Sequence, residues 1–220
     1  MFESELTELR DRPAAAFLRD LPADSTYVVG GAVRDWLLGR PVADVDFLVA
    51  NLSPAELETR LSAHGHVLPV ESRNFGVFVF RPWDAAESFE LALPRADHWT
   101  GLGYKEVETV LGVSVEEDLA RRDFTVNAMA LSLEGRLIDP CGGSDDARAG
   151  LIRAVGDPAT RFREDPTRLL RGLRLACELE FEIEPQTWQA LAAHVGEIQR
   201  LTAQGVPRAV SYTHLTLPTN

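Results

Sequence analysis

The sequence predicts an α/β or α+β fold over its first 146 residues and a helical segment after them. In the first part, short β-branched or aromatic runs alternate with helical patterns. Strand signals stop after the turn-rich stretch DPCGGSDD at 139–146, and we place a domain boundary there. The resulting domains span 1–146 and 147–210. A chain of 220 residues, 45% of them hydrophobic, can bury the core of one large or two small domains.

Local signals set the limits of the expected elements. Proline at Leu21-Pro22 ends the first helix, and Gly39 ends the helix of AVRDWLLGR. Ser53 is a typical helix cap, with Pro54 in the first turn. In chain order we expect a helix at 5–20, a strand at 26–30, a helix at 32–39, a strand at 46–50, a helix at 54–63, and strands at 66–70, 75–80 and 89–93.

Two later segments are predicted from their apolar spacing. Residues 94–112 contain glycines, a tryptophan and few periodic apolar residues, so we expect a long loop there. The stretch EDPTRLLRGLR and the residues after it have helical spacing, with one packed and one cationic face. The packed face would hold Leu169, Leu170, Leu173, Ala176 and Cys177, and the cationic face Arg168, Arg171 and Arg174. Alternatively, the arginines form an ordinary solvated face behind a helix cap.

The charge distribution directs the search for a polyanion site. A net charge of -12 argues at first against nucleic acid, which usually leaves a basic footprint. Residues 121–174, however, hold ten arginines against eight carboxylates, so a polyanion site is expected there. The charged N-terminus does not resemble a signal peptide, and no apolar run approaches the roughly 20 residues of a membrane helix. We therefore expect a cytoplasmic protein with no membrane partner and with free cysteines.

The stretch VVGGAVRDWLLGRPVADVDFLVA combines features of a nucleotide and metal site. Asp44 and Asp46 are two apart, so an extended backbone points both carboxylates to one side, where they suit Mg²⁺. Gly30 and Gly31 fall between a strand and a helix start, where backbone amides can approach a triphosphate. Arg34 can add a charged fork to the same phosphates.

Each of these residues also has a simpler interpretation. The aspartates can be solvated turn residues, the glycines a plain turn, and Arg34 a surface partner of a carboxylate. The pattern DVDFL is also similar to the first motif of haloacid-dehalogenase-type phosphatases, but there a hydrophobic strand precedes the aspartates, whereas here LLGRPVA does. The combination within about 25 residues favours a nucleoside-triphosphate and metal site.

Three longer motifs carry a family resemblance. The stretches GGAVRDWLLGRPVADVDFLV, EEDLARRDFTVNAMAL and LIDPCGGSDDARAGLIRAVGDPATRFREDPTRLLRGLR, in this order, resemble the CCA-adding tRNA nucleotidyltransferases and bacterial poly(A) polymerases over residues 27–199. The resemblance implies an α+β nucleotidyltransferase head with a mixed β-sheet and flanking helices, followed by an all-α neck. Further body and tail domains would follow, and the residues 211–220, SYTHLTLPTN, look like a foreign tail.

The resemblance also implies roles for individual residues. Asp44 and Asp46 would hold the metal ions, and Glu90 would be a third catalytic carboxylate, although a plain exposed strand glutamate is an alternative. Glu164 would orient Arg168, which would select the base together with Asp165. The other implied nucleotide-binding residues are Gly30, Gly31, Arg34, Arg122, Asp123, Asn127, Arg171 and Arg174.

The activity implied by the resemblance is Mg²⁺-dependent addition of C and A to the tRNA 3′ end from CTP and ATP. Addition of CC only, addition of A only and poly(A) synthesis are the nearest alternatives. The short connection ESRNFGVFVF lacks an arginine-rich segment expected of poly(A) polymerases, which favours tRNA. A nucleotide- or RNA-binding fragment without turnover is an alternative from another class.

Overall fold

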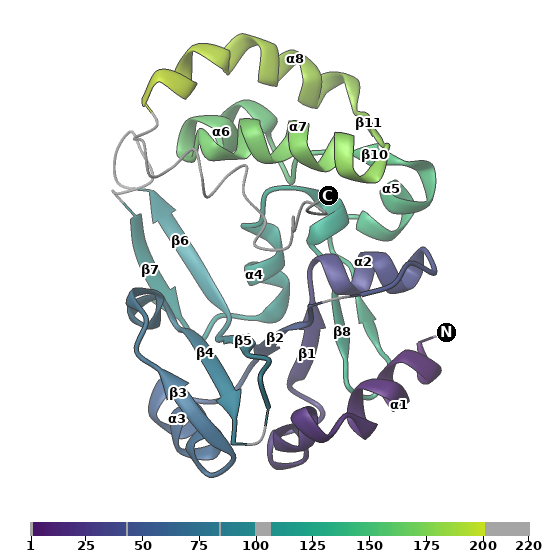
Figure 1. Cartoon of the computed structure of the whole chain (residues 1–220). Helices are drawn as coiled ribbons and strands as arrows, with labels where there is room; N and C mark the ends of the chain where they lie inside the picture. The colour runs from purple at the N-terminus through teal and green to yellow at the C-terminus, as the bar shows by residue number, and fades with distance from the viewer. Residues whose placement is uncertain (1, 43, 84, 100–106, 201–220) are drawn as a thin grey trace, which may run out of the picture.

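The computed structural model describes residues 2–42, 44–83, 85–99 and 107–200 (Figure 1). Its main sheet has seven strands in the order β3-β4-β5-β2-β1-β8-β9. Only β2 and β5 pair in parallel, so the expected mixed sheet is confirmed. The strands are β1 (Thr26–Val29), β2 (Asp46–Val49), β3 (Gly65–Leu68), β4 (Val77–Pro82), β5 (Phe89–Ala92), β8 (Ala130–Ser132) and β9 (Leu137–Ile138).

Helices flank this sheet and form the C-terminal part. The α-helices are α1 (Glu3–Asp11), α2 (Gly31–Leu37), α3 (Pro54–Ser62), α4 (Val115–Ala120), α5 (Gly143–Ala149), α6 (Pro158–Glu164), α7 (Thr167–Leu179) and α8 (Pro185–His194). Short 3₁₀ helices are η1 (Pro13–Asp20), η2 (Glu71–Phe75), η3 (Thr125–Asn127) and η4 (Val195–Arg200). None of the helices in the described ranges has the length and apolar character needed to span a membrane.

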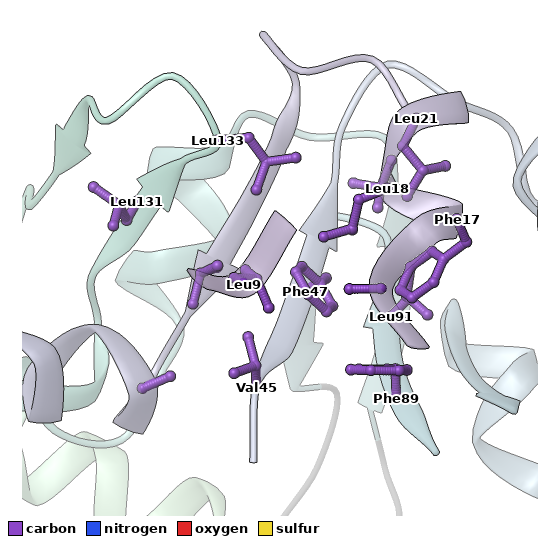
Figure 2. Packing of buried hydrophobic residues seen from close by; sticks show 14 of the residues in the cluster. Leu9, Phe17, Leu18, Leu21, Val45, Phe47, Phe89, Leu91, Leu131 and Leu133 are labelled. Carbon is purple, nitrogen blue, oxygen red and sulfur yellow. The ribbon is translucent and has the colours of Figure 1, made fainter. Parts of the chain in front are cut away.

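The core under α1 and η1 fixes the strands that carry the predicted carboxylates. Figure 2 shows side chains from these two helices packed on β2 and β5. The ring of Phe17 lies 5.9 Å from that of Phe47 in β2 and 5.1 Å from that of Phe89 in β5, measured between centroids. These aromatic contacts hold the two parallel strands side by side. Asp46 and Glu90, each next to one of these rings in its strand, point to the opposite face of the sheet.

Two expected elements differ from the structure. The helix expected at 5–20 is two helices, because Pro13 has no N–H to continue α1 and begins η1 instead. The loop expected at 94–112 contains β6 (Arg95–Trp99) and β7 (Val107–Leu111), which pair antiparallel. Residues 100–106 of that expectation lie outside the described residues. Partly buried residues alternate with exposed ones along β7, a strand pattern too weakly apolar to predict.

The C-terminal part is mostly helical, but it also holds two short strands that the sequence did not signal. These strands, β10 (Leu151–Ile152) and β11 (Glu182–Ile183), pair in parallel. Helix α5 spans the domain boundary expected at 146–147, and that boundary stays a prediction. In Figure 1, α6, α7 and α8 gather at the end of the molecule remote from α1 and α3.

The packed face predicted for α7 is wrong in part, since Leu169 is buried and Ala176 packs on the core but other members are not buried. Leu173 and Cys177 are exposed, whereas Arg168 is only 9% exposed. The reason lies in Gly172, whose missing side chain lets the ring of Phe124 approach so closely that a Cβ would lie 2.8 Å from it. This contact turns a different face of the helix inward. The buried residues of α7 are Arg168, Leu169, Gly172, Leu175 and Leu179.

Candidate functional site

The neighbouring parallel strands β2 and β5 bring together three carboxylates, Asp44, Asp46 and Glu90, which we call the carboxylate floor. Asp46 is the first residue of β2, and the register of β2 with β5 places it beside Glu90. Asp44 lies two residues before Asp46, in the segment that leads into β2. Loss of hydration, then repulsion by Glu90 and more weakly by Asp44, raises the pKa of Asp46 to about 6, while Arg122 opposes the shift. Loss of hydration likewise raises the pKa of Glu90.

This floor offers ligands to a divalent ion but not a complete coordination shell. Among the described residues, no cluster of three or more His, Cys, Asp or Glu side chains could hold a metal ion. Mg²⁺, however, is usually bound by one or two carboxylates, with water and phosphate oxygens as its other ligands. Loss of hydration and, after it, repulsion by Glu90 and Asp44 raise the pKa of Asp46, and a bound cation would relieve both effects. Asp44 and Asp46 therefore fit a divalent ion that binds together with a triphosphate.

Gly30 brings backbone close to the arginine side of the site. Its φ of +71° and ψ of −133° lie in a region that only glycine adopts without strain. A Cβ at this position would lie 3.4 Å from Nη1 of Arg122. Gly31 follows as the first residue of α2. The two glycines thus leave open space beside a guanidinium group, as a phosphate site requires.

Arg34 joins α2 to η3 and is almost fully buried. Its Nε and Nη2 both donate to Asp35 at 2.8 Å, and its Nη1 donates to Oδ1 of Asn127 at 2.7 Å. These contacts resemble the simpler interpretation, a carboxylate partner, more than an arginine reaching for phosphate. Arg34 therefore fixes the orientation of Asn127, and its direct contact with a nucleotide stays a prediction.

Asp118 in α4 binds two adjacent arginines and was not predicted as a site residue. Its side chain is fully buried. Oδ1 accepts from Nη2 of Arg121 at 2.6 Å and from the backbone N–H of Arg95 at 3.2 Å. Oδ2 accepts from Nη2 of Arg122 at 3.1 Å. This single carboxylate therefore orients both arginines and fastens β6 to α4.

The arginine pair is also tied to its surroundings through other atoms. Nη1 of Arg121 donates to Oδ2 of Asp97 at 2.9 Å, and its Nε donates to the carbonyl of Arg95 at 2.8 Å. Nη1 of Arg122 lies 3.3 Å from the carbonyl oxygen of Asn127. The β6–β7 hairpin is thereby connected to the same side chains that line the site.

Asp123 links this region to α7. It is buried, accepts from the backbone N–H of Phe124 at 2.9 Å and pairs with Nη2 of Arg171 at 2.8 Å. Burial opposes its charge, but the positive charges of Arg171, Arg168 and Arg122 and the N–H of Phe124 outweigh burial and lower the pKa of Asp123. Asp123 is therefore a charged anchor between two parts of the molecule.

The predicted base-selecting residues lie at the junction of α6 and α7. Oε2 of Glu164 accepts from Nη1 of Arg168 at 2.8 Å and from Nη1 of Arg161 at 3.0 Å. Nη2 of Arg168 donates to the carbonyl of Arg121 at 3.2 Å. Asp165 accepts from the backbone N–H and hydroxyl of Thr167, and both bonds end on its Oδ1. The sequence prediction that Glu164 orients Arg168 agrees with this geometry.

A pocket of about 520 Å³ gathers most of these groups. The predicted residues that line it are Gly30, Gly31, Asp46, Arg122, Asp123, Asn127, Asp165, Arg168 and Arg171. The predicted residues outside its lining are Arg34, Asp44, Glu90, Glu164 and Arg174. Of these, Arg174 agrees least with its predicted nucleotide-binding role, because its Nε lies 3.6 Å from Oε1 of Glu178.

Seven further lining residues were not predicted individually as site residues. They are Phe75, Arg95, Asp97, Trp99, Val107, Thr109 and Arg121. Most belong to the β6–β7 hairpin, which was expected to be a loop, so no periodic signal pointed to them. A larger pocket, of about 640 Å³, lies between η1 and the end of β4 and contains none of the predicted site residues. The smaller pocket, which gathers those residues, is therefore the candidate site.

Comparisons with known proteins agree on one family. The sequence pattern of the "Poly A polymerase head domain" matches residues 26–153. The "Multifunctional CCA protein" of Nitrosococcus oceani is 43% identical over 186 residues, which are 83% of this chain and 43% of that protein. The "CCA-adding enzyme" of Bacillus licheniformis is 41% identical over 184 residues, 81% of this chain and 44% of that protein.

Solved structures give the same result. The Bacillus stearothermophilus CCA-adding enzyme in complex with CTP superimposes with a TM-score of 0.72 and 32% identity, over 94% of this chain and 47% of that chain. The Thermotoga maritima CCA-adding enzyme complexed with tRNA_CCA gives a TM-score of 0.71 and 28% identity, over 94% and 48%. The chain thus spans less than half the length of these relatives.

Proposed function

Since this chain belongs to the poly A polymerase head domain family, we propose that it adds C and A from CTP and ATP to the 3′ end of tRNA. One observation carries the proposal: Asp46 and Arg122 line the same pocket as Asp165 and Arg168. The pocket thus contains the carboxylate that we propose for metal binding, the arginine proposed for phosphate binding and the pair proposed for base selection. Relatives named as CCA-adding enzymes support tRNA as the acceptor.

The proposed reaction is a nucleotidyl transfer. The 3′-hydroxyl oxygen of the RNA bonds to the α-phosphorus of the nucleotide, the bond to the β-phosphate oxygen breaks, and pyrophosphate leaves. Asp44 and Asp46 would hold divalent ions, for which we propose Mg²⁺, because their oxygens are the ligands it prefers. Bound there, the ions would lower the pKa of the attacking hydroxyl and neutralise the triphosphate. Glu90 stays a predicted third carboxylate.

The arginine side of the pocket would hold the triphosphate and ribose. Arg122 is kept in place by Asp118 and leaves its Nη1 edge toward Gly30. Asp123 and Asn127 are fixed by their own arginine partners, so they would shape the sugar site without reorganising. Preorganised charges of this kind stabilise the transition state more than mobile ones.

Base choice follows from hydrogen-bond complementarity. Cytosine and adenine each present an amino donor beside a ring-nitrogen acceptor. Asp165 can accept from the amino group through its second oxygen, and Arg168 can donate to the ring nitrogen. Uracil and guanine present a carbonyl and a ring N–H at these positions and fail both tests. Since Glu164 and the carbonyl of Arg121 restrain Arg168, one site would serve both CTP and ATP.

The decisive experiment measures Mg²⁺-dependent incorporation of labelled CTP and ATP into tRNAs that end before CCA, after C and after CC. It compares this chain with a version fused to the C-terminal half of the Nitrosococcus oceani relative. Ordered addition of C, C and A supports the proposal, whereas long A tails or a single added nucleotide type indicate a sister activity. CTP binding without transfer by either version supports the binding-fragment alternative.

Two variants test the assigned residues. The double variant Asp44→Ala, Asp46→Ala should abolish transfer while the protein stays folded, and retained transfer would refute the metal assignment. Asp165→Ala should relax discrimination against UTP and GTP, and unchanged discrimination would refute the base-selection model. The cytoplasmic location expected from the sequence stays a prediction.

A further inference from the structure

Two aromatic side chains of the pocket wall have no role in the transfer described above. Phe75 ends η2 and Trp99 ends β6, and both line the pocket that also contains Asp46. Phe75 is 41% exposed, whereas the other nine phenylalanines, all within the described residues, are buried or half-buried. An exposed aromatic ring beside a cluster of arginines is a feature of sites that bind nucleic-acid bases.

The fold fixes the position of Phe75. Gly76 follows it with a φ of +74°, and a Cβ there would lie 2.7 Å from Leu111 of β7, so the turn packs tightly on the hairpin. Nη1 of Arg95 donates to the carbonyl of Phe75 at 2.8 Å, and its guanidinium carbon lies 5.8 Å from the centre of the ring. The backbone of Phe75 is thus held by the tight turn at Gly76 and by the hydrogen bond from Arg95. The residue is still 41% exposed and lines the pocket.

We propose that Phe75 and Trp99 form a stacking platform for the unpaired bases at the 3′ end of the acceptor RNA. This inference rests on the proposed function, because it names the second substrate's contact in the same pocket. The incoming base is assigned to Asp165 and Arg168, which come from the junction of α6 and α7 rather than from η2 and β6. Arg95, between the two aromatic residues in the sequence, adds positive charge for the phosphates of the same strand.

A platform of this kind suits an acceptor whose last base changes. After each addition the terminal base is different, so a contact that read base edges would fail at one of the steps. Stacking on an aromatic face tolerates every base, since each has a π-face. The pocket would therefore read the incoming base through hydrogen bonds and accept the terminal base through stacking.

The test measures two affinities of the full chain. Fluorescence anisotropy with a 5′-labelled six-nucleotide RNA ending in CC reports acceptor binding, and calorimetry with CTP reports nucleotide binding. Phe75→Ala and Trp99→Ala should each weaken RNA binding by about 5- to 150-fold, the range for loss of one stacked base, and leave CTP affinity within about twofold. Phe75→Tyr should retain RNA binding. Trp83→Ala removes a ring that is 56% exposed but outside this pocket, and it should change neither affinity.

Several outcomes would overturn the platform. These are RNA affinities of Phe75→Ala and Trp99→Ala equal to that of the unmodified chain, no RNA binding by the unmodified chain, and an equal loss of CTP and RNA affinity in Phe75→Ala. Failure of the proposed function is a separate result, since it shows in the incorporation assay as absence of nucleotide transfer to tRNA. Normal CTP binding with unaffected RNA binding in both variants refutes the platform alone.

Discussion

At the scale of single residues, Asp46 couples charge at the site to the stability of the fold. Its pKa is about 6 in the folded, metal-free protein, against 3.8 for a free aspartate. The ionised form therefore disfavours the folded state above about pH 6, and the penalty disappears as the pH falls from 6 toward 4.

Asp46→Asn should accordingly stabilise the metal-free protein at pH 7.5. Because the side chain is exposed, solvent screening reduces the gain to on the order of 1 kcal/mol. Urea unfolding at pH 7.5 and pH 3.5 measures it, and the gain should be almost lost at the lower pH, which lies below both pKa values. An equal gain at both pH values, or none at pH 7.5, would contradict the assigned charge repulsion.

Asp118 makes the opposite prediction, because it is a buried charge that is fully paired. Asp118→Ala leaves Arg121 and Arg122 without their common acceptor, and we expect a loss of about 3–5 kcal/mol in the free energy of unfolding. Asp145→Ala is the matched control, since Asp145 also pairs with an arginine at i+3 but is 90% exposed. Its loss should stay below about 1 kcal/mol. Equal losses in the two variants would show that Asp118 is no more than a surface partner.

Sequence reasoning found Glu164 and Arg168 but missed Asp118 for a physical reason. The family resemblance implied that Glu164 orients Arg168, and the two side chains form an ion pair across the junction of α6 and α7. Asp118 follows two other acidic residues in EEDLARRD, and only the packing of β6 on α4 shows that it is buried while Glu116 and Glu117 are exposed. The sequence likewise does not show that Arg34 bonds to Asn127 across the fold.

At the scale of elements, α7 depends on Gly172 to reach the rest of the protein. Gly172→Ala should gain up to about 1 kcal/mol of helix propensity but lose about 1–3 kcal/mol, because the new methyl group would lie 2.8 Å from Phe124. Gly196→Ala is the control, since no atom lies within 4 Å of a Cβ there. Thermal unfolding should show a lower Tm for the first variant only. A raised Tm in both would mean that α7 can shift without cost.

The sequence predicted elements well where capping and turn residues mark their ends. Ser53 and Glu56 form the capping box that begins α3, and Gly39 ends the α2 region with a φ of +65°. The sequence failed where packing decides, as in the inward face of α7 and the β6–β7 hairpin. The structure of those two elements depends on contacts with residues distant in the chain, and local propensity does not depend on such contacts.

At the scale of the whole molecule, residues 121–174 carry a small excess of positive charge although the net charge of the chain is -12. If a few pocket arginines neutralise RNA phosphates, the logarithm of the RNA affinity should fall with the logarithm of salt concentration with a slope of about −2. Arg171→Gln, at the pocket, should reduce the steepness by about 0.7, whereas Arg163→Gln, exposed outside it, should not. Titrations at several salt concentrations measure the slopes, and a salt-independent affinity would rule out phosphate contacts.

The place of β1 in the sheet has a consequence for synthesis. β1 ends at Val29, but one of its two neighbours, β8, begins only at Ala130. A ribosome takes roughly 5 to 20 s to make the chain between them. During that time one edge of β1, whose residues are all buried in the finished protein, has no partner strand. Nascent chains are therefore most exposed to pairing with one another in this interval, and protection by a chaperone at this stage would raise the yield of folded protein.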